Sequence, residues 1–401
     1  MSPGRVGPGK TDGRVGPEKT DGRVGPGKTH GLEDSIRDAH VLVTTGAGGV
    51  GKTTTAAALG VAAARQGRRV LVLTIDPARR LAQAMGLDGL DDTPARVPLP
   101  DEVTGELHAM MLDMQTTFDR LIDTHATSPA NARAIKSNRI YRTLSSTLSG
   151  TQEYMAMERL HELHETGEWD LLVVDTPPTR SALDFLDAPK RMTSFLDGKL
   201  LRLLLKPSVA AGRGVGKAIG FGATAFIRVA GKVTGMDLLE DLADFFRNFE
   251  GMYDGFKERA AQVLVLLQQP SSRFVVVTSP EPPPLREARF FLERLEQEGL
   301  NAAGLVVNRV RPEVPRDPSD AALARAAEAQ PDDDLGRGVA GALFLLGDVR
   351  GLAARQRRDV DAARYGLRVD PVVHVPLLGD DVHDLDGLSA IATTLTTGST
   401  R

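Results

Sequence analysis

The stretch that decides the fold is Gly46-Ala47-Gly48-Gly49-Val50-Gly51-Lys52-Thr53. An apolar run, Val41–Val43, precedes it, and Thr54–Leu59, which is typical of a helix, follows it. A strand, a glycine loop and a helix N-terminus form a cradle for a nucleoside triphosphate, because the loop N–H groups and the helix dipole both attract phosphate. The sequence therefore predicts a P-loop.

Two side chains of this loop are suited to the chemistry of ATP. Lys52 can reach the β- and γ-phosphates, and the Thr53 hydroxyl can ligate Mg²⁺. The alternative is a glycine-rich strand-to-helix turn that binds no ligand. The residues predicted to bind ATP around the loop are Gly46, Gly48, Gly49, Val50, Gly51, Lys52, Thr53 and Thr54.

Residues 4–30 are a nine-residue repeat, GRVGPGKTD, GRVGPEKTD and GRVGPGKTH. Its first and third copies also match G-x4-G-K-T, but no apolar strand precedes them. Pro8 and Pro26 remove a backbone N–H where a phosphate cradle needs donors. We interpret residues 1–35 as a disordered low-complexity tail and residues 36–401 as the P-loop ATPase domain.

The composition limits the classes of function. A chain of 401 residues can form one large α/β domain with an insertion, and its net charge of −4 gives no sign of nucleic-acid binding. No apolar run in the sequence is long enough to predict a membrane span or an export signal, so we expect a cytoplasmic protein. The absence of cysteine excludes disulfides and thiolate metal sites.

Short apolar runs recur along the chain and predict the strands of a doubly wound, mostly parallel α/β sheet. These runs are Val41–Thr45, Val70–Asp76, Leu171–Asp175, Phe274–Ser279, Leu305–Asn308 and Val372–Val375. Ligands of such sheets bind beyond the carboxyl ends of the strands, where Asp76, Asp175 and Asn308 stand.

Each of these three side chains has a functional and a structural interpretation. Asp76 can orient or deprotonate the attacking water, or it can cap the following helix. Asp175 ends a Walker-B-like strand near the predicted Mg²⁺, or it is an ordinary strand-end acid. Asn308 can donate to and accept from an adenine edge, or it can form a turn.

Two segments predict a helical insertion, at about residues 106–165 and 190–268. In the first, Met110, Met111 and Met114 fit a helical face with Phe118, Leu121 and Ile122. We favour the interpretation that this face belongs to the core over the alternative that it is a binding surface. Lys199–Lys232 is basic and rich in leucine and glycine, so it suits an anionic membrane or an apolar partner as well as a soluble lid. The stretch Arg311–Gly338 is typical of a mobile loop.

Together with the glycine loop, three motifs make the chain resemble the ArsA family of arsenical-pump and tail-anchored-protein-targeting ATPases. These motifs are Asp76-Pro77-Ala78, Asp175-Thr176-Pro177-Pro178-Thr179 and Val307-Asn308. The resemblance runs from about Ala39 to the C-terminus and implies ATP hydrolysis by a nucleotide-sandwich dimer. It also implies that Asp76 activates water and acts with Lys52, that Thr53 and Asp175 serve Mg²⁺, and that Asn308 contacts adenine.

The chain departs from this family in three ways. Ala47 stands where the loop usually carries a lysine that acts on the partner subunit's site, Arg79-Arg80 replace polar residues, and cysteine is absent. An arsenite pump is therefore not expected. We expect a Mg²⁺-dependent ATPase that works as a homodimer or with a paralogous subunit and switches a surface for a hydrophobic client or a membrane-associated partner. The alternatives are a weakly hydrolysing ATP-binding scaffold and a ParA/MinD-like positioning ATPase.

Overall fold

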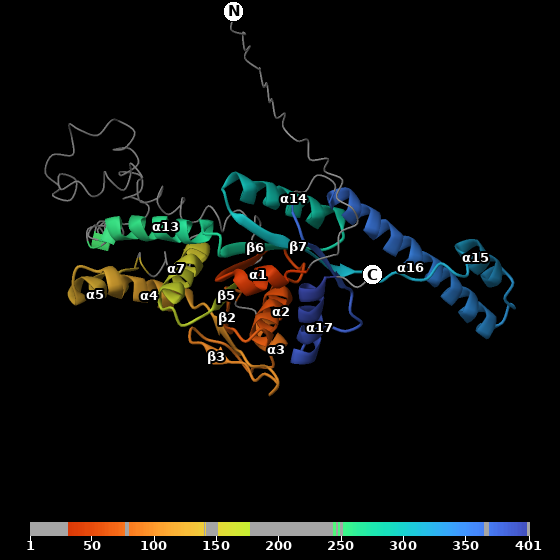
Figure 1. Cartoon of the computed structure of the whole chain (residues 1–401), viewed down its shortest axis with the longest axis horizontal. Helices are drawn as coiled ribbons and strands as arrows, with labels where there is room; N and C mark the ends of the chain where they lie inside the picture. Colours follow the sequence, from red (N-terminus) through yellow and green to blue (C-terminus); the bar gives the residue numbers. More distant parts are fainter. Residues whose placement is uncertain are drawn as a thin grey trace, which may run out of the picture.

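The apolar runs of the sequence form one sheet in the order β3-β4-β2-β5-β1-β6-β7-β8 (Figure 1). Its strands are β1 (Val41–Thr45), β2 (Arg69–Thr74), β3 (Ala95–Arg96), β4 (Glu106–Met111), β5 (Leu171–Asp175), β6 (Ser272–Thr278), β7 (Asn301–Val310) and β8 (Val372–Pro376). Every neighbouring pair is parallel except β3 and β4, which are antiparallel. All six predicted strands, the parallel sheet and the α/β class are confirmed.

The computed structural model describes residues 31–76, 80–139, 141, 151–176, 244–245, 248, 252–364 and 369–398. Several predictions from sequence lie outside these residues. They are residues 1–30 of the predicted tail, Pro177-Pro178-Thr179, the basic segment Lys199–Lys232 and most of the second part of the insertion. The prediction of a disordered tail is wrong for residues 31–35, because Leu32 is buried and a helix begins at Glu33.

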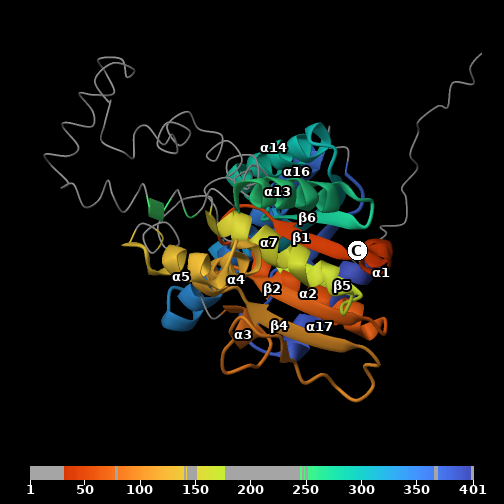
Figure 2. The same cartoon turned by 90° about the vertical axis from the view of Figure 1, so that its left-hand side faces the viewer.

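Helices cover both faces of the sheet (Figures 1 and 2). One face packs on α1 (Glu33–Asp38), α2 (Lys52–Arg65), α3 (Arg80–Ala84) and α17 (Leu385–Thr397). The other packs on α4 (Met114–His125), α5 (Pro129–Ser137), α7 (Thr151–Glu165), α13 (Tyr253–Gln268), α14 (Pro282–Gln297) and the end of α16 (Asp334–Arg364). Alternate residues of β1 point to opposite faces, with Leu42 in the first core and Val41 and Val43 in the second.

The prediction that residues 106 onward are largely helical is wrong for its first six residues. Glu106–Met111 is strand β4, which pairs in parallel with β2. Leu107 and Met110 are buried in the cores on opposite faces of the sheet. Methionine and alanine favour helices in isolation, but pairing with β2 and burial on both faces outweigh that preference here. The helix of the methionine face begins only at Met114.

The prediction of a loop over Arg311–Gly338 is also wrong for much of its length. Residues 311–319 have no regular structure, but α15 (Asp320–Glu328) follows, and α16 starts at Asp334. Ser319 caps α15, because its hydroxyl accepts a hydrogen bond from the Ala322 N–H at 3.3 Å. Helix α16, strand β8 (predicted as Val372–Val375) and helix α17 then close the chain in that order.

Candidate functional site

The glycine loop joins the end of β1 to the start of α2, at the carboxyl edge of the sheet. Gly46 has φ +148°, and a Cβ there would lie 1.9 Å from the carbonyl oxygen of Val277 on β6. Gly51 has φ +97°, and a Cβ there would lie 2.2 Å from Nδ2 of Asn308. At these two positions the loop has both the backbone conformation and the close approach that only glycine accepts.

Lys52 is the first residue of α2 and points back into the loop. Its Nζ donates hydrogen bonds to the carbonyl oxygens of Gly46 at 3.1 Å and Ala47 at 3.0 Å. Burial lowers the pKa of Lys52, while the charge of Asp175 opposes that change. The loop therefore encloses a cation at its centre, as a phosphate-binding site requires.

Asp175, the last residue of β5, accepts hydrogen bonds from hydroxyl groups on two other elements. Its Oδ2 accepts hydrogen bonds from Thr53 Oγ1 at 2.8 Å and Thr74 Oγ1 at 2.9 Å. The side chain is buried, and within the described chain its Oδ1 has no hydrogen-bond partner. Burial raises the pKa of Asp175 to about 6, against the opposing effect of the two hydroxyl donors.

These residues fit a Mg²⁺ ion bound together with phosphates. Mg²⁺ commonly binds through one or two carboxylates, with waters and phosphate oxygens completing its shell. Asp175 supplies a buried carboxylate with a spare oxygen, next to the Thr53 hydroxyl at the start of α2. The described residues contain no cluster of three or more histidine and acidic side chains that could hold a metal without a nucleotide.

Asp76 lies two residues beyond the end of β2, beside this cluster. Its backbone N–H donates to Thr74 Oγ1 at 3.2 Å, and its charge raises the pKa of Asp175. The carboxyl ends of β1, β2 and β5 therefore bring Lys52, Asp76 and Asp175 together. The helix-capping interpretation of Asp76 involves residues 77–79, which lie outside the described chain.

Asn308 lies on the other side of the loop. Its Nδ2 donates to the carbonyl oxygen of Val50 at 2.8 Å, and its Oδ1 accepts from the Arg309 N–H at 2.9 Å. Arg309 has a positive φ of 61° and donates from Nη1 to the Gly49 carbonyl at 3.0 Å. These two residues of β7 support the loop from beneath, a role that sequence reasoning missed for Arg309.

Two adjoining hollows run from the loop toward the end of β8. The first, about 280 Å³, contains Lys52, Thr53 and Asp76. The second, about 400 Å³, contains Asn308 and the segment Pro376–Val382, and both share Thr54, Asp381 and Val382. Joined, they have the size of a typical small-ligand site. Lining residues that the sequence reasoning did not single out are Gln83, Ala84, Asp381, Val382 and His383.

A parallel sheet flanked by helices, with a phosphate-type loop between its first strand and helix, defines the class of P-loop nucleotide-binding proteins. The model of the anion-transporting ATPase family, ArsA, matches residues 39–331, well over half of the chain. The chain belongs to this family of ATPases, which confirms the resemblance drawn from its motifs.

Three relatives can each be aligned with about two thirds or more of this chain. A putative arsenical pump-driving ATPase of Aquifex aeolicus is 26% identical over 280 residues, covering 68% of this chain and 64% of its own. An uncharacterised protein of Streptomyces coelicolor is 29% identical over 352 residues, covering 88% and 75%. The ATPase GET3 of Malassezia globosa is 26% identical over 265 residues, covering 66% and 71%. The chain thus spans between about two thirds and three quarters of these proteins.

The length and hydropathy of the helices decide whether any of them could span a membrane. Among the helices that the structure describes, none combines the length and apolar character needed to cross a membrane.

Proposed function

We propose that this chain hydrolyses ATP with Mg²⁺ in a dimeric nucleotide sandwich and uses the reaction to switch a surface for a hydrophobic client. The observation that carries this proposal is the meeting of Thr53, Thr74 and Asp175, with one buried carboxylate oxygen left over, beside Lys52 of the loop. Family membership supplies the class of reaction, and the strand-end acids supply the chemistry.

The chain's own residues divide the work of hydrolysis. The loop N–H groups and Lys52 bind the phosphates and offset the charge that develops on the γ-phosphate. Asp76 positions the attacking water in line and accepts its proton through the carboxylate. Thr53 and Asp175 would hold Mg²⁺, which would supply positive charge against the phosphates when bound. We assign the base to Asn308 and the Pro376–Gly379 segment, which line the second hollow.

Ala47 is the reason to include a second subunit in the proposal. It lies partly buried in the loop and has no charge to offer a neighbouring site. A paralogous subunit with lysine at this position would supply the missing cation in a heterodimer. Arg80, at the start of α3, is a second source, because it lines the same hollow as Lys52 and Asp76.

The test of hydrolysis is Asp76→Asn, compared with Asp381→Asn, which alters a carboxylate in the same hollow. We expect Asp76→Asn to lower turnover by about 100-fold or more and leave ATP binding nearly unchanged, since it removes a general base without removing a phosphate contact. Asp381→Asn should retain turnover. Equal activity in both variants would contradict the role of Asp76.

The test of the second subunit uses the lysine position. Adding a lysine-bearing paralogue, or the substitution Ala47→Lys, should raise turnover by roughly tenfold or more, because a cation contributed in trans stabilises the transition state. Robust turnover by this chain alone that Arg80→Ala abolishes would instead assign the cation to Arg80 and rule out the need for a partner lysine.

The client surface is proposed on the insertion helices. Helices α4, α5, α7 and α13 share one core on the face of the sheet away from α2 and α17 (Figure 2). A cytoplasmic ATPase with such an insertion suits a hydrophobic protein or a membrane-associated partner. Identifying the proteins that bind only with ATP tests this, and a chain that instead co-sediments with DNA or bare liposomes would favour a ParA/MinD-like positioning role.

A scaffold that binds ATP but hardly hydrolyses it is the second candidate. Ala47 favours it, since the chain lacks the family lysine. Single-turnover cleavage that depends on Asp76 would exclude this candidate. ATP binding without any such cleavage, alone or with a paralogue, would support it.

A further inference from the structure

Helices α15 and α16 form an arm that leaves the body of the molecule (Figure 1). α16 has 31 residues, which corresponds to a length of about 46 Å at 1.5 Å per residue. Its C-terminal half packs on α14 and β7, with Ala353 and Val360 buried. Its N-terminal half packs on α15 and otherwise faces solvent, so the arm has a fixed root and an extended tip.

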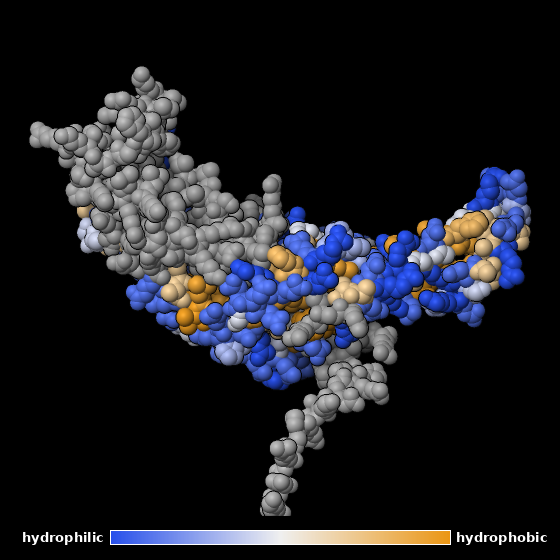
Figure 3. Space-filling view, turned by 90° about the horizontal axis from the view of Figure 1, so that it is seen from above, coloured by the Kyte–Doolittle hydropathy of each residue, from blue (hydrophilic) through white to orange (hydrophobic). Residues whose placement is uncertain are grey.

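The tip half of α16 exposes large apolar side chains. Leu335 is 78% exposed, Leu345 63% and Val339 39%, and Figure 3 shows apolar residues among hydrophilic ones at this end of the molecule. On a helix of 3.6 residues per turn these side chains share one face. We call this face the arm stripe; it consists of Leu335, Gly338, Val339, Ala342, Leu345, Leu346 and Val349.

We infer that the arm stripe binds the same stripe of a second copy of this chain, with the two α16 helices antiparallel. The inference goes beyond ATP hydrolysis, and it rests on the proposed function only in taking a dimer as given. It adds a contact between subunits that lies on the arms, apart from the nucleotide cleft.

The stripe is self-complementary about Ala342. In an antiparallel pair, residues equally distant from Ala342 on either side lie opposite each other, so Leu335 meets the partner's Val349 and Val339 meets the partner's Leu345. Gly338 meets the partner's Leu346. A Cβ at Gly338 would have no atom within 4 Å, so the space beside it is open to a large side chain. Small residues facing large ones allow two helices to approach closely.

Charge favours the antiparallel arrangement over the parallel one. The tip carries Asp332, Asp333 and Asp334, all exposed, and it stays acidic although Arg337 pairs with the first and the third of them. The root carries a groove of about 250 Å³ whose charged residues are Glu313, Arg316, Arg350, Arg357 and Arg358. Antiparallel arms bring each acidic tip beside the partner's basic root, whereas parallel arms would place tip against tip and root against root.

The groove at the root is suited to receive carboxylates. Arg350 is buried, donates to the Pro318 carbonyl at 2.7 Å and lies 3.3 Å from Asp320, and within the described residues its Nε has no partner. Arg357 is held by Glu313 at 2.7 Å. Four arginines against Glu313 and Asp320 leave this groove positive, and arginine pairs with carboxylates through two parallel hydrogen bonds.

The contact is too small to hold two chains together by itself. About four helical turns in one helix pair bury less than the roughly 1,200 Å² of a stable interface. The arms therefore act together with the nucleotide sandwich, because a chain already held at one contact meets the second at a high effective concentration. Once the sandwich opens, only the weak arm contact remains, and oxidation of paired thiols can trap it.

The absence of cysteine gives a direct test. In Ala342→Cys the two new thiols face each other across the two-fold axis, so mild oxidation should convert most of the protein into covalent dimers. Phe344→Cys is the matched control: it lies on the same helix and Phe344 is 51% exposed, but two positions turn it about 200° away. A mixture of Leu335→Cys and Val349→Cys chains should form the mixed dimer.

The expected results separate this inference from the proposed function. Cross-linking is scored without nucleotide, and hydrolysis is scored on the reduced wild-type protein, so either can fail alone. Leu345→Glu should weaken self-association about tenfold or more, because it places a charge in the stripe of both chains. Equal cross-linking of Ala342→Cys and Phe344→Cys, or no cross-linking of Ala342→Cys, would overturn the antiparallel contact.

Discussion

Asp175 and Asp92 are both buried acids, yet only Asp92 has an arginine within hydrogen-bonding distance. Asp92 Oδ2 lies 2.6 Å from Arg120 Nη2. Asp175 accepts hydrogen bonds from two threonine hydroxyls, and its nearest cationic influence is the longer-range charge of Lys52. Among the described residues, the molecule therefore buries carboxylates in two ways, one paired with an arginine and one without an arginine partner.

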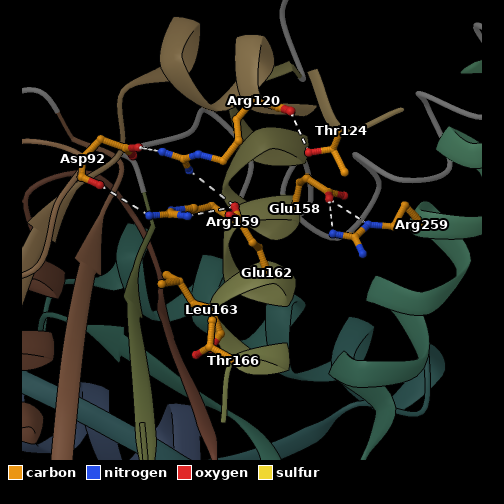
Figure 4. Close-up of polar contacts among 9 residues, drawn as sticks. All are labelled: Asp92, Arg120, Thr124, Glu158, Arg159, Glu162, Leu163, Thr166 and Arg259. Atoms are coloured by element: carbon orange, nitrogen blue, oxygen red, sulfur yellow. Dashed lines mark hydrogen bonds and ion pairs between the residues drawn. The ribbon is translucent and has the colours of Figure 1, made fainter. Parts of the chain in front are cut away.

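Asp92 belongs to a network that joins the edge of the sheet to the insertion helices (Figure 4). Arg120 of α4 lies between Asp92 and Glu162 of α7, and Arg159 lies 2.8 Å from Glu162. On the next turn of α7, Glu158 pairs with Arg259 of α13, where Nη2 and Nε lie 2.6 and 2.8 Å from Oε1. Through these pairs, α4, α7 and α13 are fixed to one another by charge.

A spare oxygen does not separate the two kinds of acid. Within the described residues, Asp92 and Glu158 each have one buried oxygen without a hydrogen-bond partner, as Asp175 does. The difference is that Asp92 and Glu158 each have an arginine within hydrogen-bonding distance, whereas Asp175 has hydroxyl donors. Two hydroxyl donors and the charge of Lys52 only partly offset the burial of Asp175, and its pKa rises to about 6. A carboxylate kept at that cost in a phosphate-binding cleft is suited to a divalent cation that arrives with the substrate.

The largest effect is expected where a neutralising cation is removed from the network. Arg259→Met leaves Glu158 buried, with its side chain only 4% exposed, and should lower the free energy of unfolding by about 3 to 5 kcal/mol. The double variant Glu158→Gln, Arg259→Met should recover most of that loss, because no unpaired charge remains. Urea unfolding of the two variants measures both values.

An exposed ion pair provides the control for this prediction. Arg289 and Glu293 on α14 are 3.9 Å apart, and both are more than half exposed. Arg289→Met should change the free energy of unfolding by less than about 0.5 kcal/mol, since solvent screens such pairs. If Arg259→Met and the double variant are equally destabilised, Glu158 is not a charge that needs its partner.

Much of this comparison could be anticipated from sequence, because strand ends are readable in an α/β protein. Asp175 follows four apolar residues, and that pattern alone places it at the carboxyl edge of the sheet. Thr74 and Arg80 gave no such signal, because a hydroxyl inside a strand and an arginine in a short helix are common everywhere. Asp381 and His383 reach the cleft from the other end of the chain, which only the fold can show.

The elements missed from sequence have a common cause. Strand β4 is rich in residues that favour helices, and it is a strand because β2 offers it a paired edge. Helix α15 follows a segment of prolines and aspartates that is typical of a loop. In both cases neighbours distant in sequence decide the outcome. The network around Asp92 was missed for the same reason, since its members come from three helices and the loop before β3.

Asp175→Asn tests the acid that has no arginine partner among the described residues. Its effect on the free energy of unfolding should be opposite in sign to that of Arg259→Met. Removing a buried charge should raise the free energy of unfolding of the nucleotide-free protein by about 1 to 3 kcal/mol at pH 7.5. Because the folded pKa of Asp175 is raised to about 6, the folded wild type binds the extra proton below that pH. The advantage of the variant should therefore shrink as the pH falls from about 6 to about 4.

Thermal unfolding of both proteins between pH 4 and pH 8 gives this difference directly, and other titrating groups cancel in it. The wild-type contribution of Asp175 falls as the pH rises through that window and is constant above it. The same variant should lose Mg²⁺-dependent hydrolysis. A variant that is less stable than the wild type at pH 7.5 would show that the chain itself neutralises Asp175.

The smallest effect is expected when one of the two hydroxyls that donate hydrogen bonds to Asp175 is removed. Thr53 and Thr74 donate to the same oxygen at nearly the same distance, but only Thr53 lies at the start of α2, where the phosphates are expected. Each hydrogen bond lowers the pKa of Asp175, so Thr74→Val should raise that pKa and move the acidic limb of the turnover profile to higher pH. At pH 8 its turnover should stay within about threefold of wild type, consistent with the loss of one hydrogen bond of about 1 kcal/mol or less.

Thr53→Val removes an equivalent hydrogen bond together with the proposed Mg²⁺ ligand. It should lose turnover at every pH, and Thr53→Ser, which restores the hydroxyl, should recover it. Isothermal titration with Mg²⁺ and a non-hydrolysable ATP analogue separates metal binding from chemistry in all three variants. If Thr53→Val and Thr74→Val behave alike, both threonines only position Asp175, and the metal is held without the hydroxyl at the start of α2.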